Sequence, residues 1–223
     1  KVGDPHQLGG TLPGLKLSNP SAITRNKLIG NAKLVADAVN LDLLIQIANA
    51  SGDLELPSAP VFNKKTFRIA FADDQAFHLT IQDNLDLLRR AGAEIVPFSP
   101  IADKKLPQDI WGIYLPSGYP HLYALELSNN KEMLQEIWNF VQNGGKLYAE
   151  GAALSYLSKK FLLKNGTFHE MIGVLPGNVS VQIADNELPQ ITYQEVLTTD
   201  KSIIAPKGIK LCGFSDNRCS IRL

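Results

Sequence analysis

Residues 146–157 read KLYAEGAALSYL, and this stretch decides how the chain folds. Its first four residues have the apolar pattern of a strand, and its last four continue as a helix. Between them lies a short turn in which Gly151 is followed by two alanines. A strand that enters a helix through such a turn is typical of a nucleophile elbow, which holds a Ser or Cys side chain in a strained position. The central residue here is Gly151, which has no side chain.

Strands and helices alternate on the N-terminal side of this turn. Apolar runs predict three more strands, at 67–71, 93–97 and 111–115. Between successive strands, apolar residues at helical spacing predict one helix near 81–88 and another near 133–141. This alternation indicates an α/β fold, with a mostly parallel sheet and helices on both of its faces.

Local signals mark the ends of these helices and the place of a site. Thr80 and Asp83 have the spacing of a capping box, so we expect them to begin the first helix. Gly92 ends that helix, and Gly144 with Gly145 ends the second. Ligands of open α/β sheets bind beyond the carboxyl ends of the strands. Three turns lie there and are the first places to search: 72–80, 116–121 and 150–153.

The two ends of the chain carry weaker signals. Asn19 followed by Pro20 predicts the start of a helix that runs to about Val39, and a short apolar helix follows it. Residues 52–65 carry prolines and polar residues, which indicate a linker. We therefore divide the chain into an irregular and helical linker segment, 1–65, and a domain, 66–223. Towards the C-terminus, two short strands are expected, near 179–183 and 191–196.

The composition excludes several classes of protein. The 223 residues include 22 Lys plus Arg and 22 Asp plus Glu, so the formal net charge is zero. This argues against non-specific electrostatic binding to nucleic acid or to an anionic membrane. The two cysteines are too few for a disulfide framework or a four-cysteine zinc site, and the four histidines have no metal-binding spacing. No apolar stretch would span a membrane and no apolar signal region is present, so we expect a cytoplasmic protein.

Several segments together resemble one family. Residues 67–103, the LPSGYP of 115–120 and the IGVLPG of 172–177 resemble the glutamine amidotransferase domain of cobyrinate a,c-diamide synthase. The YAEGAALSYL of 148–157 resembles that family's elbow, YAECGGLMYL. Residues 15–48 are similar to the helical stretch that precedes the domain in that family. The resemblance implies a class I glutamine-amidotransferase-like fold with flavodoxin-like layers.

The resemblance also implies an activity, and this chain departs from it. In the family, an N-terminal domain binds ATP and magnesium and activates corrin carboxylates. The C-terminal domain hydrolyses glutamine with a Cys nucleophile, a His base and backbone N–H groups that stabilise the oxyanion. Here Gly151 stands at the cysteine position, Ala152 and Ala153 replace two glycines, and the GFSDN of 213–217 replaces a segment with two histidines. No P-loop motif occurs, so we expect no ATP, magnesium or other cofactor in this chain.

The candidate site residues follow from the turns and from the resemblance. We expect Ser117, Gly118, Gly151 and Ala152 to face each other as a vestigial pocket, because topology places both turns at adjacent strand ends. Three residues of the first turn are candidates for a contact role, with a solvated loop as the alternative: Asp73, Asp74 and His78.

Other reactive side chains are interpreted as structural. We interpret Cys212 and Cys219 as thiols of a β region, and Ser155 as a helix serine that bonds to its own backbone. His121 follows the Gly-Tyr-Pro turn as a loop residue, and His169 belongs to no metal motif.

Three hypotheses about function stay open. The first is a protein like cobyrinate a,c-diamide synthase whose glutaminase is inactive, and whose partner is an ATP-binding amidoligase domain or subunit. The second is a working ATP- and glutamine-dependent amidoligase that uses an unorthodox residue and has its ATP-binding domain outside this chain. The third is a module that binds a small ligand or a protein through the old pocket. A homo-oligomer is compatible with all three.

Overall fold

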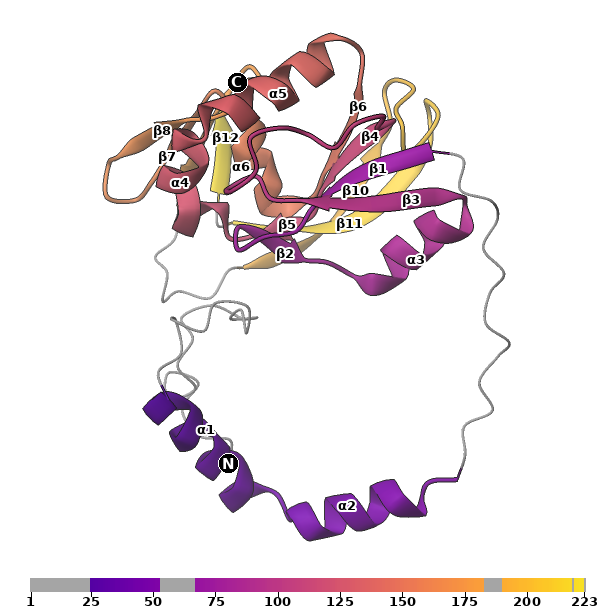
Figure 1. Ribbon diagram of the computed structural model, residues 1–223, viewed down its shortest axis with the longest axis vertical. Coiled ribbons are helices and arrows are strands. Elements are labelled where there is room, and N and C mark those ends of the chain that lie inside the picture. The colour runs from indigo at the N-terminus through magenta and orange to yellow at the C-terminus, as the bar shows by residue number, and fades with distance from the viewer. Residues whose placement is uncertain (1–24, 53–66, 183–189, 218, 223) are drawn as a thin grey trace. The chain divides into compact units, whose positions relative to one another are not determined.

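Four parallel strands form the centre of the larger part of the molecule (Figure 1). The computed structural model describes residues 25–52, 67–182, 190–217 and 219–222. The strand order is β3-β1-β4-β6, and every neighbouring pair is parallel. The strands are β1 (Phe67–Ala72), β3 (Ala93–Phe98), β4 (Gly112–Leu115) and β6 (Lys146–Ala149). The four predicted strands and the α/β class are therefore confirmed.

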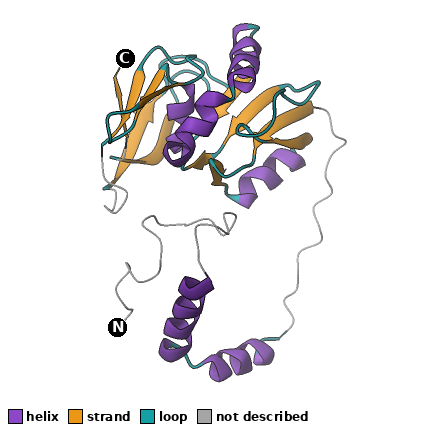
Figure 2. Cartoon of the chain, turned by 60° about the vertical axis from the view of Figure 1, so that its left-hand side comes forward, coloured by secondary structure: helices purple, strands orange, loops and turns teal. Residues whose placement is uncertain are grey.

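Helices cover both faces of this sheet, as the alternation predicted (Figures 1 and 2). Helix α3 (Gln82–Arg90) lies on one face. The opposite face carries α4 (Ala124–Asn129), α5 (Lys131–Gln142) and α6 (Leu154–Leu157). We call these the α3 face and the α4–α6 face.

The two faces have separate hydrophobic cores, because successive residues of a strand point to opposite sides. Ile113 and Leu115 belong to the larger core, which also contains residues of α4, α5 and α6 such as Ile137. Tyr114, between them in sequence, belongs to the smaller core on the α3 face. The buried members of that smaller core are Ile69, Phe71, Leu85, Ala93 and Tyr114.

The prediction of a capping box at the start of α3 is wrong. The N-cap residue is Ile81, and no side chain bonds to the first turn. Thr80 lies one position too early to cap, so Asp83 cannot complete the box with it. The predicted helix end is confirmed, since α3 stops at Arg90 and Gly92 has a positive φ of 95°.

Short strands complete this part of the chain. A second sheet has the order β12-β9-β7-β8, and it contains β7 (Lys160–Leu162), β8 (Phe168–Glu170), β9 (Asn178–Val181) and β12 (Cys219–Arg222). The antiparallel ribbon of β10 (Ile191–Leu197) and β11 (Lys210–Asp216) confirms the strand predicted at 191–196. The strand predicted at 179–183 corresponds to β9, and residue 183 lies outside the described residues.

The N-terminal part contains two helices. By its contacts the chain divides into two compact units, Lys1–Val61 and Phe62–Leu223. The first unit contains α1 (Arg25–Ala38) and α2 (Leu41–Ala50). The Asn40 side chain caps α2 by accepting a hydrogen bond from the Leu43 N–H at 3.0 Å. The helix start predicted at Asn19 and Pro20, and the linker after Gly52, lie outside the described residues. None of the described helices is long and apolar enough to cross a bilayer.

Candidate functional site

The elbow is formed where β6 ends. The Glu150 N–H donates to the Leu115 carbonyl at 3.0 Å, which extends the pairing of β6 with β4 by one bond. A 3₁₀ turn, Gly151–Ala153, then leads directly into α6. The Ala153 N–H closes this turn on the Glu150 carbonyl at 3.0 Å. The strand-turn-helix geometry expected from the sequence is therefore present.

Gly151 occupies a backbone conformation that favours glycine. Its φ is +50°, in the left-handed region, where a side chain adds steric strain. A Cβ atom at this position would lie 2.7 Å from the Ser117 Oγ and 3.3 Å from the Ser117 Cβ. The space next to Gly151 is thus already taken by the serine hydroxyl, and any side chain there would require Ser117 to move.

Ser117 and Gly118 form the other side of the site. They make up β5, which pairs with β2 (Phe77–Leu79) in antiparallel fashion. The Ser117 hydroxyl accepts a long hydrogen bond, 3.4 Å, from the Ala152 N–H of the elbow. The structure thus brings Ser117 together with Gly151 and Ala152. What these residues bind stays a prediction.

Gly118 is required by a close backbone approach. A Cβ atom at this position would lie 2.0 Å from the Ala76 carbonyl oxygen, which also accepts a hydrogen bond from the Tyr119 N–H at 2.9 Å. Only glycine allows the two segments to pass so closely. The β2–β5 pair therefore fixes Ser117 in place beside the elbow.

The comparison with protein families gives the identity of this fold. Residues 68–213 match the CobB/CobQ-like glutamine amidotransferase domain. The chain belongs to this family. The resemblance inferred from the sequence is therefore confirmed for the amidotransferase domain, and the turn at Gly151 lies within the matched residues.

Curated relatives agree with this assignment. The chain is 34% identical over 177 residues to a cobyrinate a,c-diamide synthase of Leptospira interrogans. This matched region covers 79% of this chain and 38% of the relative. It is 32% identical over 210 residues to that of Dehalococcoides mccartyi, covering 90% of this chain and 44% of the relative. For the protein of Picrophilus torridus, identity is 40% over 149 residues, which is 66% of this chain and 33% of the relative. The chain thus spans less than half the length of these relatives.

Asp74 of this amidotransferase-like domain has a structural role. One carboxylate oxygen accepts hydrogen bonds from the N–H groups of Ala76 and Phe77, at 2.8 and 3.2 Å. The other accepts from the Ser99 hydroxyl and the Ile101 N–H, both at 2.9 Å. These bonds fasten the turn before β2 to the loop after β3. Asp73, the neighbouring candidate, is exposed.

Two of the three histidines of the described residues lie against the ring of Tyr119, and the third lies elsewhere. His78 is in β2, and its ring lies 5.4 Å from that of Tyr119. The ring of His121 also lies near that of Tyr119, with ring centroids 5.9 Å apart. The His169 Nδ1 is 3.2 Å from the Ser128 hydroxyl. Within the described residues, no group of three or more His, Cys, Asp or Glu side chains is arranged to hold a metal ion.

The serine and the cysteines occupy the structural settings expected for them. The Ser155 hydroxyl donates to the Ala152 carbonyl at 2.7 Å, so it faces its own backbone. Cys212 is exposed on β11, where its Sγ lies 3.9 Å from the Glu195 carboxylate, and Cys219 is half-buried on β12. Both thiols thus belong to a β region.

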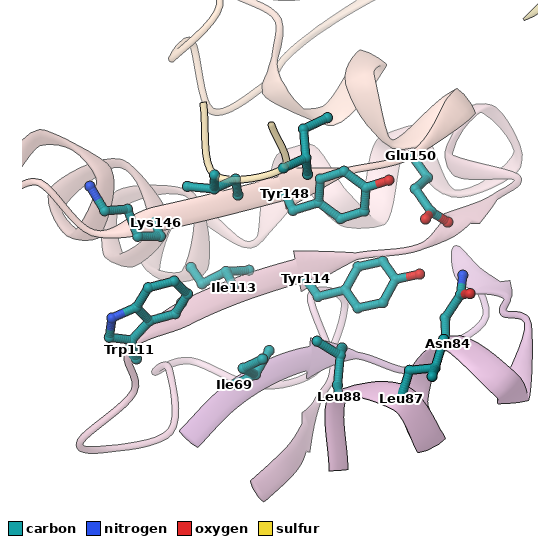
Figure 3. Close-up of a pocket in the computed structure, with 13 residues that line it drawn as sticks. Ile69, Asn84, Leu87, Leu88, Trp111, Ile113, Tyr114, Lys146, Tyr148 and Glu150 are labelled. Carbon is teal, nitrogen blue, oxygen red and sulfur yellow. The ribbon is translucent and has the colours of Figure 1, made fainter. Parts of the chain in front are cut away.

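Sequence reasoning missed a cavity on the α3 face. It has a volume of about 460 Å³ and lies between α3, the strands β1, β4 and β6, and the turn at Ile203 and Ile204 (Figure 3). Tyr114 and Tyr148 lie in its wall, directly paired between β4 and β6, with ring centroids 5.4 Å apart. Burial raises the pKa of Tyr114 to about 12, and the nearby Glu150 carboxylate contributes to the rise. Burial and Glu150 also raise the pKa of Tyr148.

Proposed function

We propose that this chain is the amidotransferase-like part of a cobyrinate a,c-diamide synthase system and does not hydrolyse glutamine. Its place would be in the amidation of corrin carboxylates in cobalamin biosynthesis, where it acts without glutaminase chemistry. The observation that carries the proposal is the elbow itself. By the resemblance, Gly151 stands at the nucleophile's position, and the proposal is supported by the Ser117 hydroxyl, which lies where a side chain at Gly151 would begin.

The chemistry of glutamine hydrolysis explains why this matters. The family's mechanism needs a nucleophile at the elbow, a base to deprotonate it, and backbone N–H groups free to bind the oxyanion. The central residue of this elbow, Gly151, has no side chain that could act as a nucleophile. The Ala152 N–H donates to the Ser117 hydroxyl. Removing a nucleophile costs several orders of magnitude in rate, so a covalent route is not expected.

The sequence of residues 213–217 supports the same proposal. By the resemblance, these residues stand where the family has its histidines, and they contain no imidazole. In the structure, Gly213, Phe214 and Ser215 belong to β11 and pair with β10. An elbow cysteine introduced alone would have a thiol pKa of about 8.5 and would be mostly protonated at neutral pH.

The names of the relatives support the pathway. Three relatives from different organisms are named cobyrinate a,c-diamide synthase, and each is more than twice as long as its matched region. We propose that an ATP- and magnesium-binding amidoligase domain or subunit is the partner of this domain. The role of the domain would then be structural or regulatory, or it would support amidation that uses free ammonia.

The deciding experiment is a glutaminase assay. The purified chain is incubated with glutamine, and the released glutamate is measured against a blank without protein. We expect no release above the blank. Glutamate release that is lost in Ser117→Ala or in a substitution of the 150–155 turn would overturn the proposal, and would favour a working amidotransferase with an unorthodox nucleophile.

Two further measurements sharpen this result. Gly151→Cys should remain inactive, both alone and combined with Ser117→Gly, because the base is still missing. Calorimetry at millimolar glutamine should show no heat of binding, since Ala152 and Ala153 add methyl groups at the turn. A micromolar dissociation constant would contradict this expectation and would indicate a glutamine sensor.

A further inference from the structure

The cavity on the α3 face is separate from the site between Ser117 and Gly151, and nothing in the proposed function uses it. Its body is apolar, with Leu87 and Leu88 from α3 and Trp111 at one end. Its volume of about 460 Å³ lies within the usual range of small-molecule sites. Its polar groups gather at the opposite end, where Figure 3 shows Asn84 and Glu150.

The buried hydroxyl of Tyr114 lies in the wall of this cavity, near Asn84 and Glu150. Tyr114 is only 4% exposed, and its hydroxyl makes no hydrogen bond of normal geometry within the described residues. Figure 3 shows this hydroxyl directed toward the end of the cavity that holds Asn84 and Glu150. A molecule that fills this end of the cavity and bonds to the hydroxyl gains a hydrogen bond at a site of low exposure.

The polar end selects for a positive charge. It combines the Glu150 carboxylate, the Asn84 amide and the hydroxyls of Tyr114 and Tyr148, so Glu150 is its acidic side chain. Carboxylate and phenol oxygens both accept hydrogen bonds, and an ammonium group supplies three donors. Lys146, the basic residue of the wall, lies at the other end beside Trp111 (Figure 3).

The body of the cavity selects for an apolar ligand. The rings of Tyr114 and Tyr148 are tilted by 55° to each other, and Leu88 and Ile69 complete the surface around them. From these observations we infer that the cavity is a binding site for a small amphipathic amine, with its ammonium at Glu150 and Tyr114 and its apolar body toward Trp111. This inference is independent of whether the elbow hydrolyses glutamine.

Tryptophan fluorescence provides a direct test. The chain has two tryptophans, Trp111 at the cavity and Trp138 on α5, so the variant Trp138→Phe reports on Trp111 alone. The probes are 4-phenylbutylamine, 4-phenylbutanol and 4-phenylbutyrate, which share one apolar body and differ in the charge of the head. We expect a saturable change with the amine, with a dissociation constant on the order of 100 µM for a ligand of this size. The alcohol should bind about tenfold more weakly, because it lacks the charge-assisted bond, and the carboxylate should be weaker still.

Two variants assign the effect to the polar end. Glu150→Gln should weaken the amine about tenfold and leave the alcohol unchanged. The matched control is Glu126→Gln, an exposed carboxylate of α4 on the other face, which should change neither. Tyr114→Phe should weaken both the amine and the alcohol, because both lose a hydrogen-bond partner, and it covers the case in which Glu150→Gln does not fold.

The inference is overturned by any of three results. One is the absence of a saturable signal with all three probes. Another is equal affinity for amine and alcohol, which would leave an apolar groove with water at the Tyr114 hydroxyl. The last is an unchanged affinity of the amine in both Glu150→Gln and Tyr114→Phe. A failure here leaves the glutaminase assay untouched, since that assay measures glutamate release and not the binding of an amine in the cavity on the α3 face.

Discussion

The two faces of the central sheet differ in how completely they are covered. On the α4–α6 face, three helices enclose a large core in which Leu115, Leu127 and Ile137 have no exposed surface. On the α3 face, one helix of nine residues covers a core of five buried residues and leaves a cavity beside it. Because the core of the α4–α6 face is larger, we expect that face to supply most of the stability of this domain. The other face is free to hold a ligand.

Truncating the core of each face should give the largest difference. Ile137→Ala should cost roughly 2–5 kcal/mol of the free energy of unfolding, because the closely packed α4–α6 face leaves a cavity behind. Leu88→Ala on α3 should cost about 1 kcal/mol, since this side chain is only half-buried and already adjoins open space. Urea denaturation of both variants measures the two costs. Equal costs would mean that the two faces contribute alike.

A buried amide on the α4–α6 side should give the next largest effect. The Asn130 side chain is 2% exposed, and its N–H groups donate to the carbonyls of Pro100, Ile101 and Asp103, at 2.8 to 3.2 Å. Asn130→Asp would remove these donors and place a carboxylate against three carbonyl oxygens. We expect a loss of roughly 2–4 kcal/mol of the free energy of unfolding, measured in urea.

A matched control lies on α5, the helix that Asn130 caps. Asn139 is exposed on α5, and its Oδ1 accepts from Gln135, an interaction that aspartate preserves. Asn139→Asp should therefore change the free energy of unfolding by less than about 0.5 kcal/mol. A cost at Asn130 as small as this would show that the three carbonyls find other partners.

How well the sequence predicted each region follows from how local its signals are. The strands at Phe67–Ala72 and Lys146–Ala149 are apolar runs with clear ends, so the sequence pattern was sufficient to predict them. The pair of β2 and β5 was missed, because two or three residues have no periodicity and are held only by pairing across about 40 positions. The capping box failed since spacing alone did not show that Ile81, and not Thr80, is the N-cap residue.

The same distinction applies to the site. Topology alone predicted that Ser117 and Gly151 would be neighbours, because adjacent parallel strands bring their ends together. That the Ser117 hydroxyl fills the space beside Gly151 depends on distances that no sequence pattern contains. The cavity was missed for a similar reason: Tyr114 and Tyr148 look like ordinary strand residues until the register of β4 and β6 pairs them.

Alkaline pH should lower the free energy of unfolding through Tyr114 on the α3 face. The folded chain keeps the Tyr114 proton up to a pKa of about 12, whereas the unfolded chain loses it near 10. Between these values the folded state binds more protons, so its stability falls as the pH rises. Free energies of unfolding measured from pH 9 to 11 should decline, and Tyr114→Phe should decline less steeply than the parent chain. Identical slopes would show that Tyr114 does not contribute.

The smallest effects are expected for two tyrosine hydroxyls, one on each face. Neither Tyr114 nor Tyr156 has a hydrogen-bond partner of normal geometry for its hydroxyl within the described residues. Tyr156 has no exposed surface, and its ring lies 5.4 Å from that of Phe77. Tyr156→Phe keeps the ring and removes the buried hydroxyl, so stability should be unchanged or should rise by up to about 1 kcal/mol.

Tyr114→Phe should be closer to neutral than Tyr156→Phe, because the Tyr114 hydroxyl adjoins a cavity where water can enter and bond to it. Thermal and urea denaturation of both variants, at neutral pH and without ligand, measure this small difference. The control Tyr156→Leu removes the ring as well, and it should destabilise clearly because the contact with Phe77 is lost. If Tyr156→Phe instead costs more than about 1 kcal/mol, its hydroxyl has a bonding partner such as a buried water molecule. The Tyr156 hydroxyl on the α4–α6 face would then be hydrogen-bonded, as the Asn130 amide is. The two faces would differ more clearly, because within the described residues only the α3 face would have a buried hydroxyl without a hydrogen bond of normal geometry.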